Sequence, residues 1–267
     1  MFTISDLVQP ETLAEAYQIL MDKRNNTILG GCGFLKMGKK RINKGIDLSQ
    51  LNLSYILEQD GFIKIGAMTS LRELEVHPLL KENFNGVLPK SVRDIIGVQF
   101  RNGVTVGASV YSKYGFSDLI TALLCLDTEV ELFKGGRMPL ADFLAKPIEK
   151  DLLVRLWIRK TIRQATYLSF RNSASDYATL NAAVSKLDNR WTIAVGARPS
   201  KAAVAVSASA MLDQEKLTFE MIEKAAQRAS EELTFGTNTR GTAAYRKALC
   251  QVLVKRGIME VAACKSN

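Results

Sequence analysis

Two short glycine-rich segments are the parts of this chain best suited to chemistry. They are Thr27–Phe34, which reads T-I-L-G-G-C-G-F, and Thr105–Ser109, which reads T-V-G-A-S. Each follows an apolar run of β type, and successive exposed N–H groups in a tight turn form a concave nest for oxyanions, above all phosphates. Glycine also serves ordinary turns, so one such segment is a weak signal. Two of them, followed by an acidic residue at Asp118, suggest a dinucleotide held between two lobes.

Neither of the familiar phosphate-binding loops fits the first segment. A Rossmann fingerprint needs a third glycine where Lys36 stands. The spacing of a P-loop is present from Gly33 to Lys39. However, Lys40 replaces the Ser or Thr whose hydroxyl would bind magnesium, and Gly45 interrupts the helix that should follow. Both motifs therefore fail at a position that their chemistry requires.

No catalytic or metal-binding set of side chains can be assembled elsewhere in the sequence. The only histidine, His77, precedes Pro78 on a helical stretch, which favours a structural or capping role. The cysteines form no C-x-x-C pair, whereas ligands of zinc and iron–sulfur clusters usually come in close pairs. These cysteines are Cys32, Cys125, Cys250 and Cys264. We therefore expect buried thiols, no catalytic side chain and no metal site.

The composition indicates a protein with substantial hydrophobic cores. The 267 residues favour two or three packed lobes, and 47% of them are hydrophobic. No apolar run reaches the roughly 18 residues of a spanning helix, and the N-terminus lacks the basic and apolar regions of a signal peptide. We therefore expect a cytoplasmic protein without a membrane span.

The net charge of +9 raises the question of a nucleic-acid partner. Basic side chains are dense in two stretches, Lys36–Lys44 and Arg155–Arg163. No recognition-helix motif, zinc finger or aromatic RNA-binding signature accompanies them. An anionic cofactor, an acidic partner subunit or a solvated basic face accounts for the excess of charge equally well.

The hydrophobic pattern predicts an α+β organisation that changes character at about Thr166. Before this point we expect helices over 10–20, 71–81, 88–96 and 118–126, and strands at 26–29, 45–48, 62–67, 103–110 and 128–132. The helix at 118–126 would take Asp118 or Ser117 as its N-cap. Beyond it we expect an antiparallel sheet from 165–171, 178–185 and 191–195, with helices over 219–233 and 242–258. That second group predicts a separate α+β lobe.

The order of these motifs resembles the FAD-binding (medium) subunit of the molybdenum hydroxylases, the family of xanthine dehydrogenase and carbon monoxide dehydrogenase. The first segment stands in the place of the family's A-G-G-[TH]-[SD]-L loop. Gln99–Ser109 matches Q-x-R-N-x-A-T-[IV]-G-G-N, Asp118 matches the Asp that opens the next helix, and Ala122–Leu132 matches the motif that ends in V-E-L. Further agreement covers nearly the whole length, at Ile65–Ala67, His77–Leu80, Arg137–Phe143 and Thr239–Arg246.

The resemblance implies a fold and a cofactor. The fold is α+β: a two-lobed FAD-binding domain of the p-cresol methylhydroxylase type, with lobes at 1–55 and 56–165, followed by an α+β C-terminal domain at 166–267 that contains an antiparallel sheet. The implied cofactor is FAD. Flavin chemistry needs positioning and tuning of the cofactor more than a protein acid or base, which agrees with the missing catalytic set.

The same resemblance implies a function and partners. The chain would be an FAD-dependent oxidoreductase subunit that passes electrons from a two-iron two-sulfur small subunit through FAD to an acceptor. That acceptor is NAD+ in the xanthine dehydrogenase branch of the family. The substrate would be oxidised on a molybdopterin-binding large subunit, and no nucleic acid would be bound.

The resemblance also implies which residues contact FAD. In the glycine segments these are Leu29, Gly30, Gly31, Cys32, Gly33, Phe34, Thr105, Gly107, Ala108 and Ser109, and elsewhere Ile95, Asp118, Leu153 and Arg171. The first loop would contact the pyrophosphate, and Asp118 would both cap its helix and reach ribitol or ribose hydroxyls. Ile95 and Leu153 would line the flavin, and the Arg171 guanidinium would stabilise the anionic reduced ring.

This chain departs from the family pattern at a few of these positions. Cys32 and Gly33 replace a hydroxyl and an acidic residue, and Ala108-Ser109 replaces Gly-Asn, but the backbone donors remain. Tyr111–Phe116 replaces a loop of small residues and proline. Two alternatives stay open: a stand-alone FAD-dependent reductase with the same FAD-binding domain, such as the UDP-N-acetylenolpyruvoylglucosamine reductases, and a basic nucleic-acid-binding protein.

Overall fold

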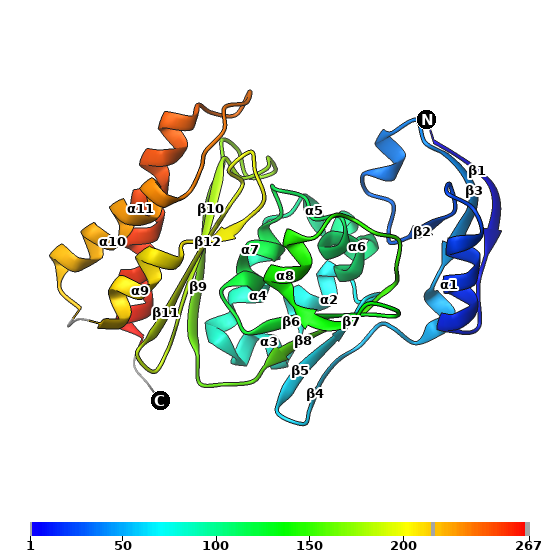
Figure 1. The fold of residues 1–267 in the computed structure, drawn as a ribbon, viewed down its shortest axis with the longest axis horizontal. Helices are drawn as coiled ribbons and strands as arrows, with labels where there is room; N and C mark the ends of the chain where they lie inside the picture. The colour runs from blue at the N-terminus through cyan, green and yellow to red at the C-terminus, as the bar shows by residue number, and fades with distance from the viewer. Residues whose placement is uncertain (1, 215–216, 265–267) are drawn as a thin grey trace. The chain divides into compact units, whose positions relative to one another are not determined.

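The computed structural model describes residues 2–214 and 217–264, and Figure 1 shows their fold. Contacts within the chain divide it into two compact units. Unit 1 comprises Met1–Leu74, Gly97–Ser112 and Thr128–Ile158. Unit 2 comprises Glu75–Ile96, Lys113–Asp127 and Arg159–Asn267.

Unit 1 contains two sheets. The first is parallel, with strand order β1-β3-β2, and the second has the order β4-β5-β8-β6-β7 with antiparallel pairs β4/β5, β6/β7 and β6/β8. The strands are β1 (Thr3–Val8), β2 (Thr27–Leu29), β3 (Arg41–Asp47), β4 (Ile56–Gln59), β5 (Phe62–Gly66), β6 (Thr128–Leu132), β7 (Gly136–Pro139) and β8 (Leu153–Arg159). The helices are α1 (Leu13–Asp22), η1 (Leu35–Met37), η2 (Ser49–Leu51), α2 (Leu71–Val76), α5 (Gly97–Gly103), α6 (Val106–Tyr111) and α8 (Leu140–Ala145).

Helix α1 shows how the first sheet is closed. The Thr12 side chain accepts from the Glu15 N–H and caps the helix N-terminus. Ala16 and Leu20, four residues apart and therefore on one helix face, are buried in a core with Ile46 of β3. This packing fixes the position of β2, which lies next to β3 and leads into the first glycine segment.

Unit 2 is built on a four-stranded antiparallel sheet with the order β12-β11-β10-β9. Its strands are β9 (Gln164–Phe170), β10 (Leu180–Leu187), β11 (Arg190–Gly196) and β12 (Ala203–Val204). Its helices are α3 (Pro78–Glu82), η3 (Phe84–Gly86), α4 (Val87–Val92), α7 (Asp118–Leu124), α9 (Val206–Gln214), α10 (Phe219–Glu232) and α11 (Ala243–Ala263).

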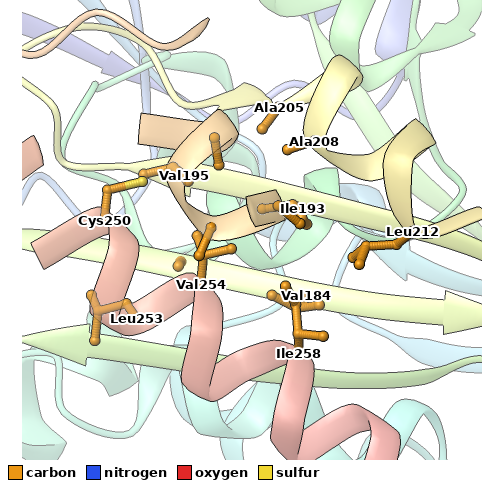
Figure 2. Packing of buried hydrophobic residues seen from close by; sticks show 14 of the residues in the cluster. Val184, Ile193, Val195, Ala205, Ala208, Leu212, Cys250, Leu253, Val254 and Ile258 are labelled. Carbon is orange, nitrogen blue, oxygen red and sulfur yellow. The ribbon is translucent and has the colours of Figure 1, made fainter. Parts of the chain in front are cut away.

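The three long helices of unit 2, α9 to α11, cover one face of this sheet (Figure 1). Figure 2 shows Val184 and Ile193 of the sheet packed with Val254 and Ile258 of α11. The approach is close at Gly257, where a Cβ would lie 2.7 Å from Val184 Cγ2. Because side chains alternate along a strand, the opposite face of β9 and β10 turns toward α7.

The predicted α+β class is confirmed, as are the antiparallel sheet and the two long helices of the C-terminal part. The strand predicted at 103–110 is wrong, because α5 ends at Gly103 and α6 begins at Val106. Thr105 determines this start, since its hydroxyl accepts from the Ala108 N–H as an N-cap.

Two smaller predictions are corrected near Pro78 and Asp118. The single helix expected over 71–81 is broken into α2 and α3, because a residue before proline is driven into extended backbone and His77 adopts it. Of the two N-caps expected for α7, Ser117 is confirmed, since its side chain accepts from the Ile120 N–H, and the capping role expected of Asp118 is wrong. Asp118 is the first helical residue, and its carboxylate is free for other contacts.

Candidate functional site

The first glycine segment forms a tight turn after β2. Leu29 is the last residue of β2, and the chain then turns through Gly31 and Cys32, which have left-handed φ values of +82° and 56°. Phe34 precedes the short helix η1, and the Lys36 N–H donates to the Cys32 carbonyl at 3.1 Å. Successive backbone N–H groups in a tight turn can form a concave site for an anion.

The two glycine segments lie against one another within unit 1. A Cβ on Gly30 would lie 2.5 Å from Ala108 Cβ and 2.9 Å from Thr105 Oγ1. A Cβ on Gly31 would lie 1.9 Å from the Gly103 carbonyl oxygen, closer than atoms can approach. Glycine is therefore required at both positions, by the side chains of Ala108 and Thr105 at Gly30 and by the backbone of Gly103 at Gly31.

The first loop keeps its backbone donors available. Among the hydrogen bonds of the described residues, none uses the N–H of Gly31, Cys32 or Gly33. Burial raises the pKa of the Cys32 thiol, an effect that outweighs the opposing charge of Lys36, so this side chain stays neutral beside the donors. Three adjacent free N–H groups can bind a pyrophosphate through charge-assisted hydrogen bonds.

The second glycine segment, Thr105–Ser109, does not present the exposed backbone N–H groups that the sequence predicts. The Val106 N–H donates to the Thr69 carbonyl and the Gly107 N–H to the Ala67 carbonyl, both at 2.8 Å. The Ser109 hydroxyl donates to the Thr105 carbonyl at 2.9 Å. This segment therefore serves as a rigid support for the first loop, and a contact of its residues with a cofactor stays a prediction.

Asp118 lies in unit 2 at the centre of a buried polar cluster. Its Oδ1 accepts from Asn181 Nδ2 at 2.9 Å and from the Tyr167 hydroxyl, and its Oδ2 accepts from Arg171 Nη2 at 2.8 Å. Tyr167 lies on β9, and Arg171 follows directly after the strand ends. The two residues are four positions apart, so their side chains share one face of the sheet, and Asn181 lies beside them on β10. The cluster joins α7 to the sheet.

The electrostatics of this cluster are those of a buried ion pair. Burial lowers the pKa of Arg171, but the adjacent Asp118 carboxylate reverses this and holds it above its usual value. Burial and the same carboxylate raise the pKa of Tyr167 well above 10, so its hydroxyl remains a donor. Arg171 Nε is buried and has no acceptor among the described residues, so one polar atom there is unsatisfied and could serve a ligand.

Sequence reasoning missed Tyr167 and Asn181. The available signal was the alternation along β9, which places residues 167, 169 and 171 on one face while Leu168 joins the core on the other. A tyrosine and an arginine on the polar face of a half-buried strand require a partner. No pattern in the sequence shows that this partner is Asp118.

Two predicted cofactor residues remain, Ile95 and Leu153. Ile95 is half-buried in unit 2, and its N–H donates to the Val92 carbonyl at the end of α4. Leu153 is buried in unit 1 as the first residue of β8, across from Leu132 of β6. Their predicted role in lining the flavin stays a prediction.

Unit 2 also contains a pocket of about 510 Å³. Its lining includes the rings of Phe116 and Tyr177, which meet edge to face with centroids 4.8 Å apart. The Arg240 guanidinium lies 4.8 Å from the Tyr177 ring centroid and is paired with the Asp176 carboxylate at 2.8 Å. Arg171 Nη1 donates to the Asp176 carbonyl, so the pocket wall is linked to the Asp118 cluster.

The described residues contain neither a metal-binding group of side chains nor a helix suited to a membrane. Within residues 2–214 and 217–264, no three His, Cys, Asp or Glu side chains are grouped so that they could hold a metal ion. None of the helices in this part of the chain has both the length and the apolar character needed to cross a membrane.

Comparison with known proteins gives two family matches. The family described as the FAD binding domain in molybdopterin dehydrogenase matches residues 2–158. The family described as the CO dehydrogenase flavoprotein C-terminal domain matches residues 165–261. Together these matches span most of the chain.

Individual relatives agree with these families. The nicotine 6-hydroxylase medium subunit of Paenarthrobacter nicotinovorans is 25% identical over 95% of this chain and 96% of its own. The glyceraldehyde dehydrogenase medium chain of Sulfolobus acidocaldarius is 25% identical over 96% and 97%. A solved chain of the carbon monoxide dehydrogenase of Hydrogenophaga pseudoflava shares the fold, with a TM-score of 0.89 and 22% identity over 97% of each chain.

Proposed function

Because the chain belongs to the family of FAD-binding domains in molybdopterin dehydrogenases, we propose that it is the electron-transferring medium subunit of a molybdenum hydroxylase-type enzyme. In this proposal electrons arrive from a two-iron two-sulfur small subunit and leave from FAD to NAD+. The substrate is oxidised on a molybdopterin-binding large subunit. Four unpaired thiols favour a reducing compartment, so we propose the cytoplasm.

The observation that carries the proposal is the turn at Gly31. The backbone of Gly31 is in close contact with Gly103, and the N–H groups of Gly31, Cys32 and Gly33 donate to no acceptor among the described residues. We propose that these donors hold the FAD pyrophosphate, with Leu29, Gly30 and Phe34 shaping the turn. When bound, FAD supplies the capacity to take up and release electrons singly or in pairs.

In unit 2 we propose that Asp118 and Arg171 contribute to cofactor binding. Asp118 already accepts three hydrogen bonds from protein donors, so its first effect is to hold Arg171 in place. The unsatisfied Arg171 Nε then offers a positive hydrogen-bond donor. A guanidinium held in this way stabilises negative charge on an adjacent ligand.

NAD+ is the proposed acceptor, and the pocket of unit 2 supports it. Phe116 and Tyr177 provide ring surfaces for stacking, and Lys201 and Arg240 provide positive charge for phosphates. We expect NADH to bleach the flavin absorbance of the holo-protein under anaerobic conditions. Tyr177→Ala should weaken NADH binding about tenfold, a loss of about 1.4 kcal/mol, while the FAD content stays unchanged.

The proposal is tested by purifying the tagged chain from its own host together with its partners. We expect FAD, molybdenum and iron in the assembled complex. Flavin reduction by the complex in the presence of a hydroxylase substrate, without flavin reduction in the isolated chain, would support the electron path. A chain without flavin, or a complex without iron or molybdenum, would contradict the proposal.

A further inference from the structure

The charged residues around the pocket of unit 2 are of one sign. Among its lining residues that the structure describes, three are cationic and none is acidic: Lys201, Arg240 and Arg246. Arg240 is balanced by Asp176, whose carboxylate lies 2.8 Å away and is not part of the lining. Arg246 has no carboxylate within ion-pair distance in the described part of the chain. A cavity with charge of one sign concentrates ligands of the opposite sign.

The Arg246 guanidinium is buried without a counter-charge. The residue lies in the first turn of α11 and is only 1% exposed. Its guanidinium donates to four neutral acceptors: the carbonyl oxygens of Thr179, Gly236 and Gly241, and Asn238 Oδ1. These acceptors orient the guanidinium but leave its charge unbalanced. Burial and the like charge of Arg240 lower the pKa of Arg246, which agrees with an uncompensated cation at this wall.

A second buried guanidinium, that of Arg198, lies beside the pocket. Arg198 is 5% exposed and stands between the lining residues Ala197 and Pro199. Its Nη2 donates to the Lys201 carbonyl at 2.6 Å, and its Nη1 donates to the Thr234 carbonyl. Its Nε has no acceptor among the described residues, and no described carboxylate is paired with it. This charge is therefore also unbalanced.

The walls that carry these two groups are joined to one another. The Gly236 N–H donates to the Arg198 carbonyl at 2.8 Å, and the Gly236 carbonyl accepts from Arg246 at 2.8 Å. A Cβ on Gly115 would lie 2.5 Å from the Ser200 carbonyl oxygen, so the backbone is closely packed there. The cations are therefore held in place within unit 2, and a ligand does not have to order them when it binds.

We propose that Arg246 and Arg198 are specificity-determining residues, through which this pocket selects a dinucleotide by its diphosphate. Arg240 and Lys201 contact the phosphates, and the two buried guanidinium groups act behind them by charge. This inference deepens the proposed function and rests on it, since it states which part of the acceptor the pocket recognises. Reduced nicotinamide riboside has the same dihydronicotinamide ring as NADH but no phosphate, so it gains nothing from these charges.

The first test separates charge from hydrogen bonding at Arg246 in the assembled, FAD-loaded enzyme. Arg246→Lys keeps the charge and loses the planar set of donors, whereas Arg246→Gln keeps amide donors and loses the charge. We expect Arg246→Gln to raise the Kd for NADH about tenfold and Arg246→Lys to raise it less than about threefold. The Kd for reduced nicotinamide riboside should not change. Both values come from the concentration dependence of flavin bleaching.

A residue that only maintained the fold of the pocket would give a different pattern. Both variants would then weaken NADH and the riboside alike, and that result overturns the proposal, as does an unchanged Kd for NADH in Arg246→Gln. Arg163→Gln is the matched control. Arg163 is 7% exposed in the same unit, but it is paired with Asp127 at 2.8 Å and does not line the pocket. The control should keep the wild-type ratio of the two Kd values.

The second test uses the wild-type enzyme and does not depend on the folding of a variant. Inorganic pyrophosphate, added at constant ionic strength, should raise the apparent Kd for NADH and leave that for reduced nicotinamide riboside unchanged. Pyrophosphate without an effect on NADH overturns the proposal.

A third measurement separates this inference from the proposed function. If neither NADH nor the riboside bleaches the wild-type flavin, NAD+ is contradicted as the acceptor. Calorimetric titration of the FAD-loaded enzyme with pyrophosphate then decides whether the pocket is a diphosphate site. Binding that weakens about tenfold in Arg246→Gln supports the inference. Absence of binding to the wild-type enzyme, or equal binding to both, overturns it.

Discussion

Gly31 and Gly103 are in such close contact that a Cβ on Gly31 would lie 1.9 Å from the Gly103 carbonyl oxygen. The two residues belong to different glycine-bearing segments, and this contact holds the first loop in the conformation that leaves its N–H groups available. A methyl group at residue 31 has no space unless one of the two backbones moves. FAD binding should therefore respond strongly to this single position.

Gly31→Ala should raise the Kd for FAD by about 100-fold, a loss of about 3 kcal/mol from displaced charge-assisted hydrogen bonds. Gly61→Ala is the matched control, because Gly61 also has a positive φ, +76°, but has no atom within 4 Å of its added Cβ. The control should lose only about 1 kcal/mol of stability from backbone strain and keep its FAD affinity. Titration of the apo-proteins by flavin fluorescence ranks them. Equal affinities would show that the pyrophosphate binds elsewhere.

Asp118→Asn should destabilise the protein by about 3 kcal/mol, because it leaves the Arg171 guanidinium as an uncompensated buried charge. Glu129→Gln breaks the partly exposed pair with Arg137 and should cost less than about 1 kcal/mol. Urea unfolding measures both changes. Similar midpoints for the two variants would mean that the Asp118 cluster contributes little to the stability of unit 2.

Stability should fall as the pH rises above 9. Burial raises the pKa of the Cys125 and Cys250 thiols from 9.0 to about 12. Between these values the unfolded chain has released both protons and the folded chain retains them, so the free energy of unfolding decreases with pH. Tyr167, whose pKa lies well above 10, adds to the loss above pH 10. Cys250→Ala should flatten the decline between pH 9 and 10 in urea unfolding, and an unchanged slope would refute this origin.

The cofactor released from the purified protein should be FAD and contain no FMN. A row of three free N–H groups at Gly31, Cys32 and Gly33 suits two linked phosphates better than one. FAD at 100 times its Kd should stabilise the apo-protein by about 2.7 kcal/mol, and FMN at the same concentration should not. Chromatography of the released flavin and thermal unfolding with each nucleotide provide the two measurements. Release of FMN alone would refute the assignment.

Much of the local structure could be predicted from sequence, because short-range chemistry determines it. Alternation of apolar and polar residues defines β6 over Thr128–Leu132. The helical period of α11 is evident from about Thr242 onward, although apolar residues on both of its faces conceal which one is buried. The strand predicted at 103–110 is wrong. Val104 and Val106 favour a strand locally, but the Thr105 N-cap and the packing of Gly107 against Ala67 favour a helix.

The sequence by itself determined the family, the α+β class and the glycine turn, because these depend on residue types at fixed short spacings. Only the tertiary structure decided which groups meet. The Asp118 carboxylate finds Tyr167 and Asn181 at sequence separations of 49 and 63 residues. The N–H groups of Val106 and Gly107 are taken up by carbonyls of another segment, while those of the first loop remain free. Such pairings follow from the packing of distant segments, where loop closure and core formation outweigh the local preferences of each residue.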